Sequence, residues 1–168
     1  MVVSFDVIAE KGDVFRVLLS SGEDAFFATP DVCAVLGSSV EIIEIDLERV
    51  SGTNPASLRT LGKISEGIFR CFEQNDKAIL YYFCDDLNDI PIIGRGKEDM
   101  WPQEYRSQLF SKMFQRYSLQ NKNLTDAVDV VVVINEEIRP LFMHFIARAQ
   151  HAHYIDILKK FVTDNYGK

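Results

Sequence analysis

Carboxylates gather in one short stretch of this sequence, FCDDLNDIPIIGRGKEDMW at residues 83–101. The stretch follows a strand-like apolar run, and in open α/β sheets ligands collect beyond the carboxyl ends of the strands. Asp85 and Asp86, with Asp89 and Asp99 as further oxygen ligands, could hold a divalent metal ion there. Aspartate and asparagine are also frequent in ordinary turns. The stretch is the best candidate for a site, and both interpretations stay open.

Arginines at helical spacing offer a second kind of chemistry. Arg106 and Arg116 both fall inside the apolar arc of the second predicted helix. A guanidinium on such a face must reach solvent or meet a carboxylate or phosphate, because an unpaired buried charge is too costly. We expect Arg106 to pair with Asp85 or Asp86. Alternatively, Arg95, Arg106 and Arg116 receive an anionic ligand through bidentate hydrogen bonds. The predicted ligand-binding residues are therefore Asp85, Asp86, Arg95, Arg106 and Arg116.

The sequence lacks the common signatures of catalytic and cofactor sites. The GRGK segment at residues 94–97 does not have the spacing of a phosphate-binding loop. His144 and His151 share a face of the last predicted helix, without an acidic residue at helical spacing to complete a zinc set. No Gly-x-Ser-x-Gly nucleophile elbow is present. The motifs alone therefore predict no catalytic residue, no metal and no cofactor.

Hydrophobic periodicity and turn residues divide the chain into strands and helices. The predicted strands span residues 2–9, 14–20, 25–29, 40–47, 78–84 and 128–134, and the predicted helices span 55–73, about 103–117 and 140 to about 164, with a short helical turn at 30–37. This order predicts an α+β fold. A mixed β-sheet opens with an antiparallel meander and continues as α-β-α-β-α, with the helices packed on the sheet. Residues 1–168 are expected to form a single domain.

The most apolar segments and the cysteines are expected to be buried. The strand at 78–84 is apolar throughout and should be central, and Val130–Ile134 should be buried on both faces. These two strands, on either side of the second helix, could pair in parallel. Cys33, Cys71 and Cys84 each have apolar neighbours and should be buried free thiols.

Composition and charge restrict the possible partners. Apolar residues make up 47% and charged residues 26% of the chain, which is typical of a globular protein. The net charge is −7 and no basic stripe is present, so nucleic acid is an unlikely partner. No apolar stretch approaches the roughly 18 residues of a membrane span, and the N-terminus does not resemble a signal peptide. We expect a cytoplasmic protein without a membrane segment.

The predicted order of elements resembles the ribonuclease-H-like fold, in which three antiparallel strands precede α-β-α-β-α. The resemblance implies that metal-binding carboxylates come from Asp6, Glu66, Asp85 and Asp156, with Asp6, Asp85 and Asp156 as the catalytic group. Mg²⁺ or Mn²⁺ ions held by such carboxylates would support phosphodiester hydrolysis. The chain departs from the family pattern in the extra strand at 40–47 and in Glu66, which comes in the middle of its helix rather than near the start.

A second resemblance covers about residues 85–117. YYFCDDLNDIPIIGRGKEDMW followed by an aromatic-rich helix is similar to a pattern in a family of small bacterial domains. In that family, a strand ending in Cys-Asp leads through an arginine-containing loop to such a helix. This resemblance implies no particular activity, because none is established for the family.

Two functions from different classes follow from these observations. The first is a binding module without catalysis, for a partner protein or a small anionic ligand. The alternative is a ribonuclease-H-like, metal-dependent nuclease or phosphoesterase. Close approach of the carboxylates of Asp6, Asp85 and Asp156 would favour the enzyme, and scattered carboxylates would favour the binding module.

Overall fold

A mixed six-stranded sheet organises the chain, whose computed structural model describes residues 2–21, 27, 29–84, 100–134 and 139–166. The strands are β1 (Val2–Ile8), β2 (Val14–Ser21), β3 (Glu41–Ser51), β4 (Ala78–Cys84), β5 (Ala127–Ile134) and β6 (Leu141–Arg148). The helices are α1 (Pro30–Leu36), α2 (Leu58–Glu73), α3 (Pro102–Gln120) and α4 (Ala152–Tyr166), with 3-10 turns at Lys122–Leu124 and Ala149–His151. The predicted α+β class, with helices packed on a mixed sheet, is confirmed.

The strand order is β1-β2-β3-β4-β6-β5. β1, β2 and β3 form an antiparallel meander, β3 and β4 pair in parallel, and β6 pairs antiparallel with both β4 and β5. The opening meander was predicted, but its third strand is β3. The strand expected at 25–29 falls mostly outside the described residues, and Phe27 and Thr29, which are described, belong to no strand.

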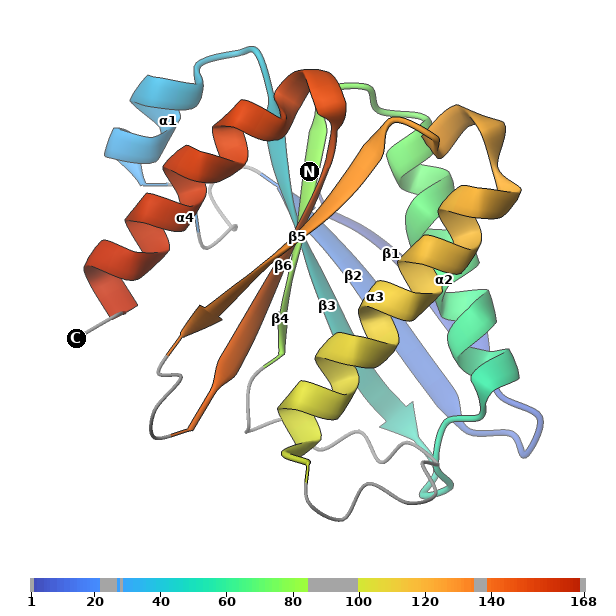
Figure 1. Cartoon of the computed structure of the whole chain (residues 1–168). Coiled ribbons are helices and arrows are strands. Elements are labelled where there is room, and N and C mark those ends of the chain that lie inside the picture. Colours follow the sequence, from blue (N-terminus) through green and yellow to red (C-terminus); the bar gives the residue numbers. More distant parts are fainter. Residues whose placement is uncertain (1, 22–26, 28, 85–99, 135–138, 167–168) are drawn as a thin grey trace.

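Helices cover both faces of the sheet (Figure 1). α2 and α3 lie on one face, over a core to which the meander contributes Phe15 and Val17. α1 and α4 lie on the other face, over Ile79, Tyr81 and Phe145. β4 runs between the two layers, and Ile79 and Tyr81 are at most 1% exposed, so the prediction of a central strand at 78–84 is confirmed. None of the described helices is long and apolar enough to cross a membrane.

The long last helix predicted from Pro140 is wrong, because Leu141–Arg148 is strand β6 and α4 begins only at Ala152. Successive side chains of β6 alternate between the two helical layers. Ile146 packs in the core beneath α2 and α3, while Met143 and Phe145 pack in the core beneath α1 and α4. A strand covered on both faces has an almost unbroken apolar sequence, which periodicity alone does not distinguish from a buried helix.

The expected burial of Val130–Ile134 on both faces is also wrong. β5 is the last strand in the order, and β6 lies between it and β4, so β4 and β5 do not pair. Val132 and Ile134 pack beneath α4, but Val131 is 37% exposed and Val133 is 42% exposed on the opposite face. An apolar β-branched run favours a strand, but it does not determine which helices cover that strand.

Helix α2 starts later than its sequence signals predicted. A helix that begins at residue 55, as predicted, would have Asn54 as its N-cap, whereas Ser57 caps the helix, its Oγ accepting a hydrogen bond from the Thr60 N–H at 3.1 Å. Asn54 instead donates to both carboxylate oxygens of Asp13, from its backbone N–H and its side-chain amide, each at 2.8 Å. Asp13 is 2% exposed, and these hydrogen bonds, led by the side-chain amide, lower its pKa. Asp13 therefore ties the β1–β2 turn to the segment that leads into α2.

Substitutions at Gly52 and Gly12 provide a matched test of the contact between Asp13 and Asn54. Gly52 has a φ of 89°, and a Cβ there would lie 1.9 Å from Oδ1 of Asp13. Gly12 has a φ of 86°, with no other atom within 4 Å of its Cβ position. We expect Gly12→Ala to lower the free energy of unfolding by about 1–2 kcal/mol, the cost of a left-handed backbone. Gly52→Ala should lower it further, because Asp13 must move away from Asn54. Urea unfolding measures both, and equal losses would contradict the role of Asp13.

The three cysteines are free thiols, as predicted, but they differ in exposure. Cys84 is buried, Cys71 is partly buried and Cys33 is exposed. Burial raises the pKa of the Cys71 thiol, which disfavours its reactive thiolate. The prediction of burial is therefore wrong for Cys33, which lies on the outer side of the short helix α1.

Candidate functional site

Helix α3 carries the two predicted site arginines that the structure describes. Arg106 is 7% exposed, as its helical position predicted, whereas Arg116 is exposed despite its place in the same apolar arc. Asp85, Asp86 and Arg95 lie outside the described residues, and so does the expected pairing of Arg106 with either carboxylate. The site can therefore be built only from the helix and the elements that it contacts.

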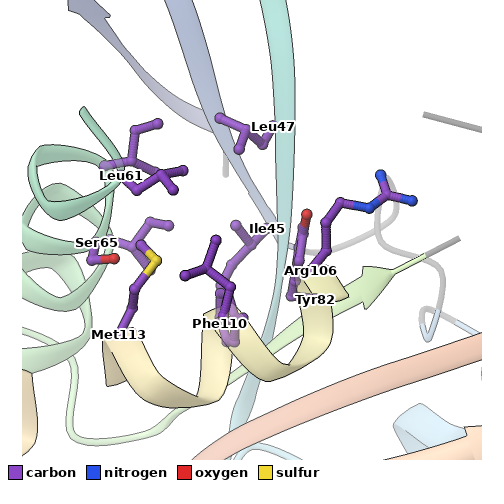
Figure 2. A pocket seen from close by; sticks show the side chains of 11 residues that line it. Ile45, Leu47, Leu61, Ser65, Tyr82, Arg106, Phe110 and Met113 are labelled. Carbon is purple, nitrogen blue, oxygen red and sulfur yellow. The ribbon is translucent and has the colours of Figure 1, made fainter. Parts of the chain in front are cut away.

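A narrow apolar crevice separates α3 from α2 above the sheet (Figure 2). Its floor is formed by β3 and β4, and its walls by the facing sides of the two helices. The lining residues are Ile45, Leu47, Leu61, Ile64, Ser65, Ile68, Tyr82, Arg106, Leu109, Phe110 and Met113. Arg106 lies beside Tyr82, with its guanidinium pointing away from Leu61 and Met113. The cavity holds only about 50 Å³, so it accepts a small apolar group and not a whole ligand.

A wider, basic groove continues outward from this crevice between the same helices. It has a volume of about 920 Å³, and it shares Leu61, Ser65, Leu109 and Met113 with the crevice. Four basic residues and one acidic residue line it, namely Arg59, Lys63, Lys112, Arg116 and Glu66. We call the crevice and the basic groove together the α2–α3 groove.

The acid in the α2–α3 groove is already paired. Glu66 accepts a hydrogen bond from Arg70 at 2.7 Å, and Arg59 lies 3.9 Å from Glu10. Among the described residues, no carboxylate forms an ion pair with Lys63, Lys112 or Arg116. These cations are therefore available to an anion that enters from solvent.

Tyr117 adds a neutral hydrogen-bond donor to the same groove. Burial, and then the nearby charges of Glu73 and Glu66, raise the pKa of its phenol. The phenol therefore stays protonated at neutral pH, and its hydroxyl already forms a hydrogen bond with Glu73. Its ring packs against Phe69 of α2, with the ring centroids 5.2 Å apart, which fixes its position at the groove.

A buried chain of polar side chains links α3 to the sheet just beyond the crevice. The Oγ of Ser107 lies 2.8 Å from Nε2 of His144, whose Nδ1 lies 3.0 Å from Oδ1 of Asp129. Ser111, one helical turn after Ser107, donates to Oδ2 of Asp129 at 2.7 Å. His144 is fully buried, Ser107 is 5% exposed, and the side chain of Asp129 is 8% exposed. α3, β6 and β5 thus supply two hydroxyls, one imidazole and one carboxylate in a continuous hydrogen-bonded series.

One aromatic ring connects the polar chain with the crevice. Phe110 stacks on Tyr82 with ring centroids 4.8 Å apart, and its centroid lies 5.0 Å from that of the His144 imidazole. Phe110 and Tyr82 both line the crevice. The ring therefore forms a wall between the apolar cavity and the imidazole.

The carboxylates named by the ribonuclease-H-like resemblance are distributed over the molecule. Asp6, on β1, accepts two hydrogen bonds from Arg16, which lower its pKa. Glu66 lies on α2 and Asp156 on α4, so these two residues are on opposite faces of the sheet. Asp85 is outside the described residues. Within the described residues, no group of three or more His, Cys, Asp or Glu side chains is arranged to hold a metal ion.

The sequence contained a partial signal for the buried polar chain. Asp129 is the only charged residue in the apolar run at 128–134, and a carboxylate there requires a partner. His144 was assigned to a helix, on a face shared with His151. In the structure His151 is apart from it, and its Nε2 lies 3.0 Å from the backbone carbonyl oxygen of Asp76. Assigning Leu141–Arg148 as a strand would have turned His144 toward α3.

Comparison with known proteins assigns no family to the chain. It is matched by no protein-family model, by no curated protein and by no solved structure. Function must therefore be inferred from the geometry of the site itself.

Proposed function

We propose that this protein is a binding module for a small anionic ligand, which it holds in the α2–α3 groove. One observation carries the proposal: four basic residues and one already paired acid line a groove on a chain whose net charge is −7. Surface cations scattered at random on such a chain would be accompanied by more acids than bases. The local excess of positive charge fits an anion, and the apolar crevice beneath it fits a nonpolar part of the same molecule.

The chemistry of the groove favours a carboxylate, phosphate or sulfonate headgroup. Arg116 can give two parallel hydrogen bonds to such a group, and Lys112, one turn before it on α3, can give a point charge. Leu109 and Met113 line both parts of the groove, so an aromatic or aliphatic body can lie against them. The flexible thioether of Met113 can adapt to ligands of different shape.

The nuclease or phosphoesterase alternative stays a prediction of the sequence. It depends on a group of carboxylates that includes Asp85, which is outside the described residues. Asp6, Glu66 and Asp156 lie on separate elements, and the first two are held by arginines. This distribution supports the binding module over the enzyme.

Binding of 8-anilinonaphthalene-1-sulfonate, which combines an anion with an aromatic body, tests the proposal. The double variant Lys112→Gln/Arg116→Gln should raise its Kd about tenfold, which corresponds to about 1.4 kcal/mol. The control is Lys159→Gln/Lys160→Gln on α4, which removes the same charge from the other face of the sheet. Fluorescence titration at low ionic strength measures each Kd, because salt screens exposed charges. Equal Kd values for the groove double variant and the wild type, or equal losses in both double variants, would refute the proposal.

A further inference from the structure

The polar chain beneath α3 has the connectivity of a nucleophile, a general base and an orienting carboxylate. We propose that Ser107 is a nucleophile toward carboxylic esters, with His144 as its general base and Asp129 holding the imidazole. The proposal rests on the hydrogen bonds from Ser107 Oγ to His144 Nε2, at 2.8 Å, and from His144 Nδ1 to Asp129, at 3.0 Å. Triads of this kind are recognised by geometry and by the role of each residue, not by position in the sequence.

The direction of each hydrogen bond follows from the chemistry of the three groups. Asp129 as a carboxylate can only accept, so Nδ1 of His144 donates to it, and the tautomer in which Nδ1 carries the single proton is the one proposed to act. Nε2 then has a free lone pair and accepts the hydroxyl proton of Ser107. This tautomer is the one that a general base requires, and the carboxylate stabilises the imidazolium that forms when Nε2 takes the proton.

The surroundings hold these groups in place. Ser111 fixes the second oxygen of Asp129 at 2.7 Å, so the carboxylate does not rotate away from His144. Phe110 packs against the imidazole, with the ring centroids 5.0 Å apart. Because His144 is fully buried, the electrostatic effect of Asp129 on the imidazole is stronger than it would be in solvent.

The reaction balances without a metal, an oxidant or a reductant. Oγ of Ser107 forms a bond to the ester carbonyl carbon while its proton passes to Nε2 of His144. The bond to the alcohol oxygen then breaks, and the alcohol leaves with that proton. Water attacks the acylated Ser107, gives a proton to His144, and the proton returns to Oγ as the carboxylic acid leaves. The sum is ester plus water to carboxylic acid plus alcohol.

A further buried acceptor lies one turn before the nucleophile. Gln103 is fully buried, and its Nε2 donates to the carbonyl oxygen of Pro140 at 3.0 Å. Its Oε1 accepts no hydrogen bond from the described residues. Side chains four residues apart share a helix face, so this oxygen and the Ser107 hydroxyl project from the same side of α3. Oε1 can accept a hydrogen bond from the water that releases the acyl group.

This inference goes beyond the binding function and does not depend on it. Phe110 separates the imidazole from the crevice, and Ser107 lines neither the crevice nor the basic groove, so the two sites are distinct. The variants at Lys112 and Arg116 test the groove alone, and variants at Ser107 test the nucleophile alone. Failure of either proposal therefore leaves the other standing.

Labelling with a small alkyl phosphonofluoridate tests the nucleophile directly. Oγ of Ser107 should form a bond to phosphorus as fluoride leaves and His144 takes the proton. We expect mass spectrometry of the native protein to find one adduct, on the peptide that contains Ser107. The control Ser118→Ala, whose hydroxyl donates only to the Gln115 carbonyl at 3.0 Å, should keep the adduct, and Ser107→Ala should lose it. A native protein that stays unlabelled, beside a serine hydrolase labelled in parallel, would overturn the proposal.

A second variant separates a reactive serine from a merely structural one. His144→Gln can still hydrogen-bond to both neighbours but cannot act as a base of comparable strength. We expect it to lower the labelling rate of Ser107 at least about 100-fold, within the range that general bases contribute. The melting temperature shows that the variant is folded. A folded His144→Gln protein labelled at the wild-type rate would also overturn the proposal.

Discussion

Replacing Phe145 by alanine should lower the free energy of unfolding by about 3–5 kcal/mol, the usual loss for a buried phenylalanine. The ring is fully buried on β6, beneath α1 and α4. Its centroid lies 5.7 Å from that of Phe27 and 6.3 Å from that of Tyr81. The cavity left by the ring would be bordered by Tyr81, which is held in place by the pairing of β4, so it could not collapse fully. Thermal unfolding should show the melting temperature falling by roughly 10 °C.

Val133→Ala is the matched control for this prediction. Val133 lies on the neighbouring strand β5 and is 42% exposed, so its truncation removes two methyl groups that are already partly exposed to solvent. We expect it to cost less than about 1 kcal/mol. Similar losses for the two variants would mean that β6 is not a central strand covered on both faces.

Removing the carboxylate of Asp129 should have the second largest effect. Asp129→Ala leaves the Nδ1–H of the fully buried His144 and the hydroxyl of Ser111 without their acceptor. Each abandoned polar group costs about 1–3 kcal/mol when water cannot replace its partner. We expect the free energy of unfolding to fall by about 2–4 kcal/mol. Urea unfolding measures this loss, and the dependence of the free energy on urea concentration should be the same as in the wild type.

Asp129→Asn provides the control for charge. The amide oxygen of asparagine can still accept from His144, and the Ser111 hydroxyl can turn to accept from the amide NH₂. We expect this variant to keep more than half of the stability that Asp129→Ala loses. An asparagine variant as unstable as the alanine variant would show that the negative charge, and not the hydrogen bonding, supports the fold.

Elements with a one-sided apolar pattern were predicted well from the sequence. α2 places Leu61, Ile64 and Ile68 on one face at steps of three and four residues, and all three side chains are buried. β6 was missed because LFMHFIAR has no one-sided apolar pattern. Such a sequence suits a strand between two helical layers as well as a buried helix. The sequence could not reveal that β6 inserts between β4 and β5, since strand order is decided by long-range contacts.

The candidate site was predicted only in part, for related reasons. The helical position of Arg106 correctly indicated its burial, because that position depends on α3 alone. The basic groove needs α2 and α3 side by side, and the chain from Ser107 to Asp129 needs α3, β6 and β5 together. Each side chain looks ordinary on its own element. Only tertiary packing shows that the three groups meet.

The place of β6 in the sheet also determines how long β4 lacks one of its two neighbouring strands during synthesis. Domains fold as their chain leaves the ribosome from the N-terminus, and Leu141, the first residue of β6, is added 57 residues after Cys84, the last residue of β4. Throughout that interval β4 pairs only with β3, and its other edge, between Ile79 and Cys84, offers unpaired N–H and C=O groups. Such an edge in an apolar strand is a template for pairing with other chains. The nascent protein is therefore most exposed to aggregation just before β6 is added, and chaperones that shield strand edges would act in that interval.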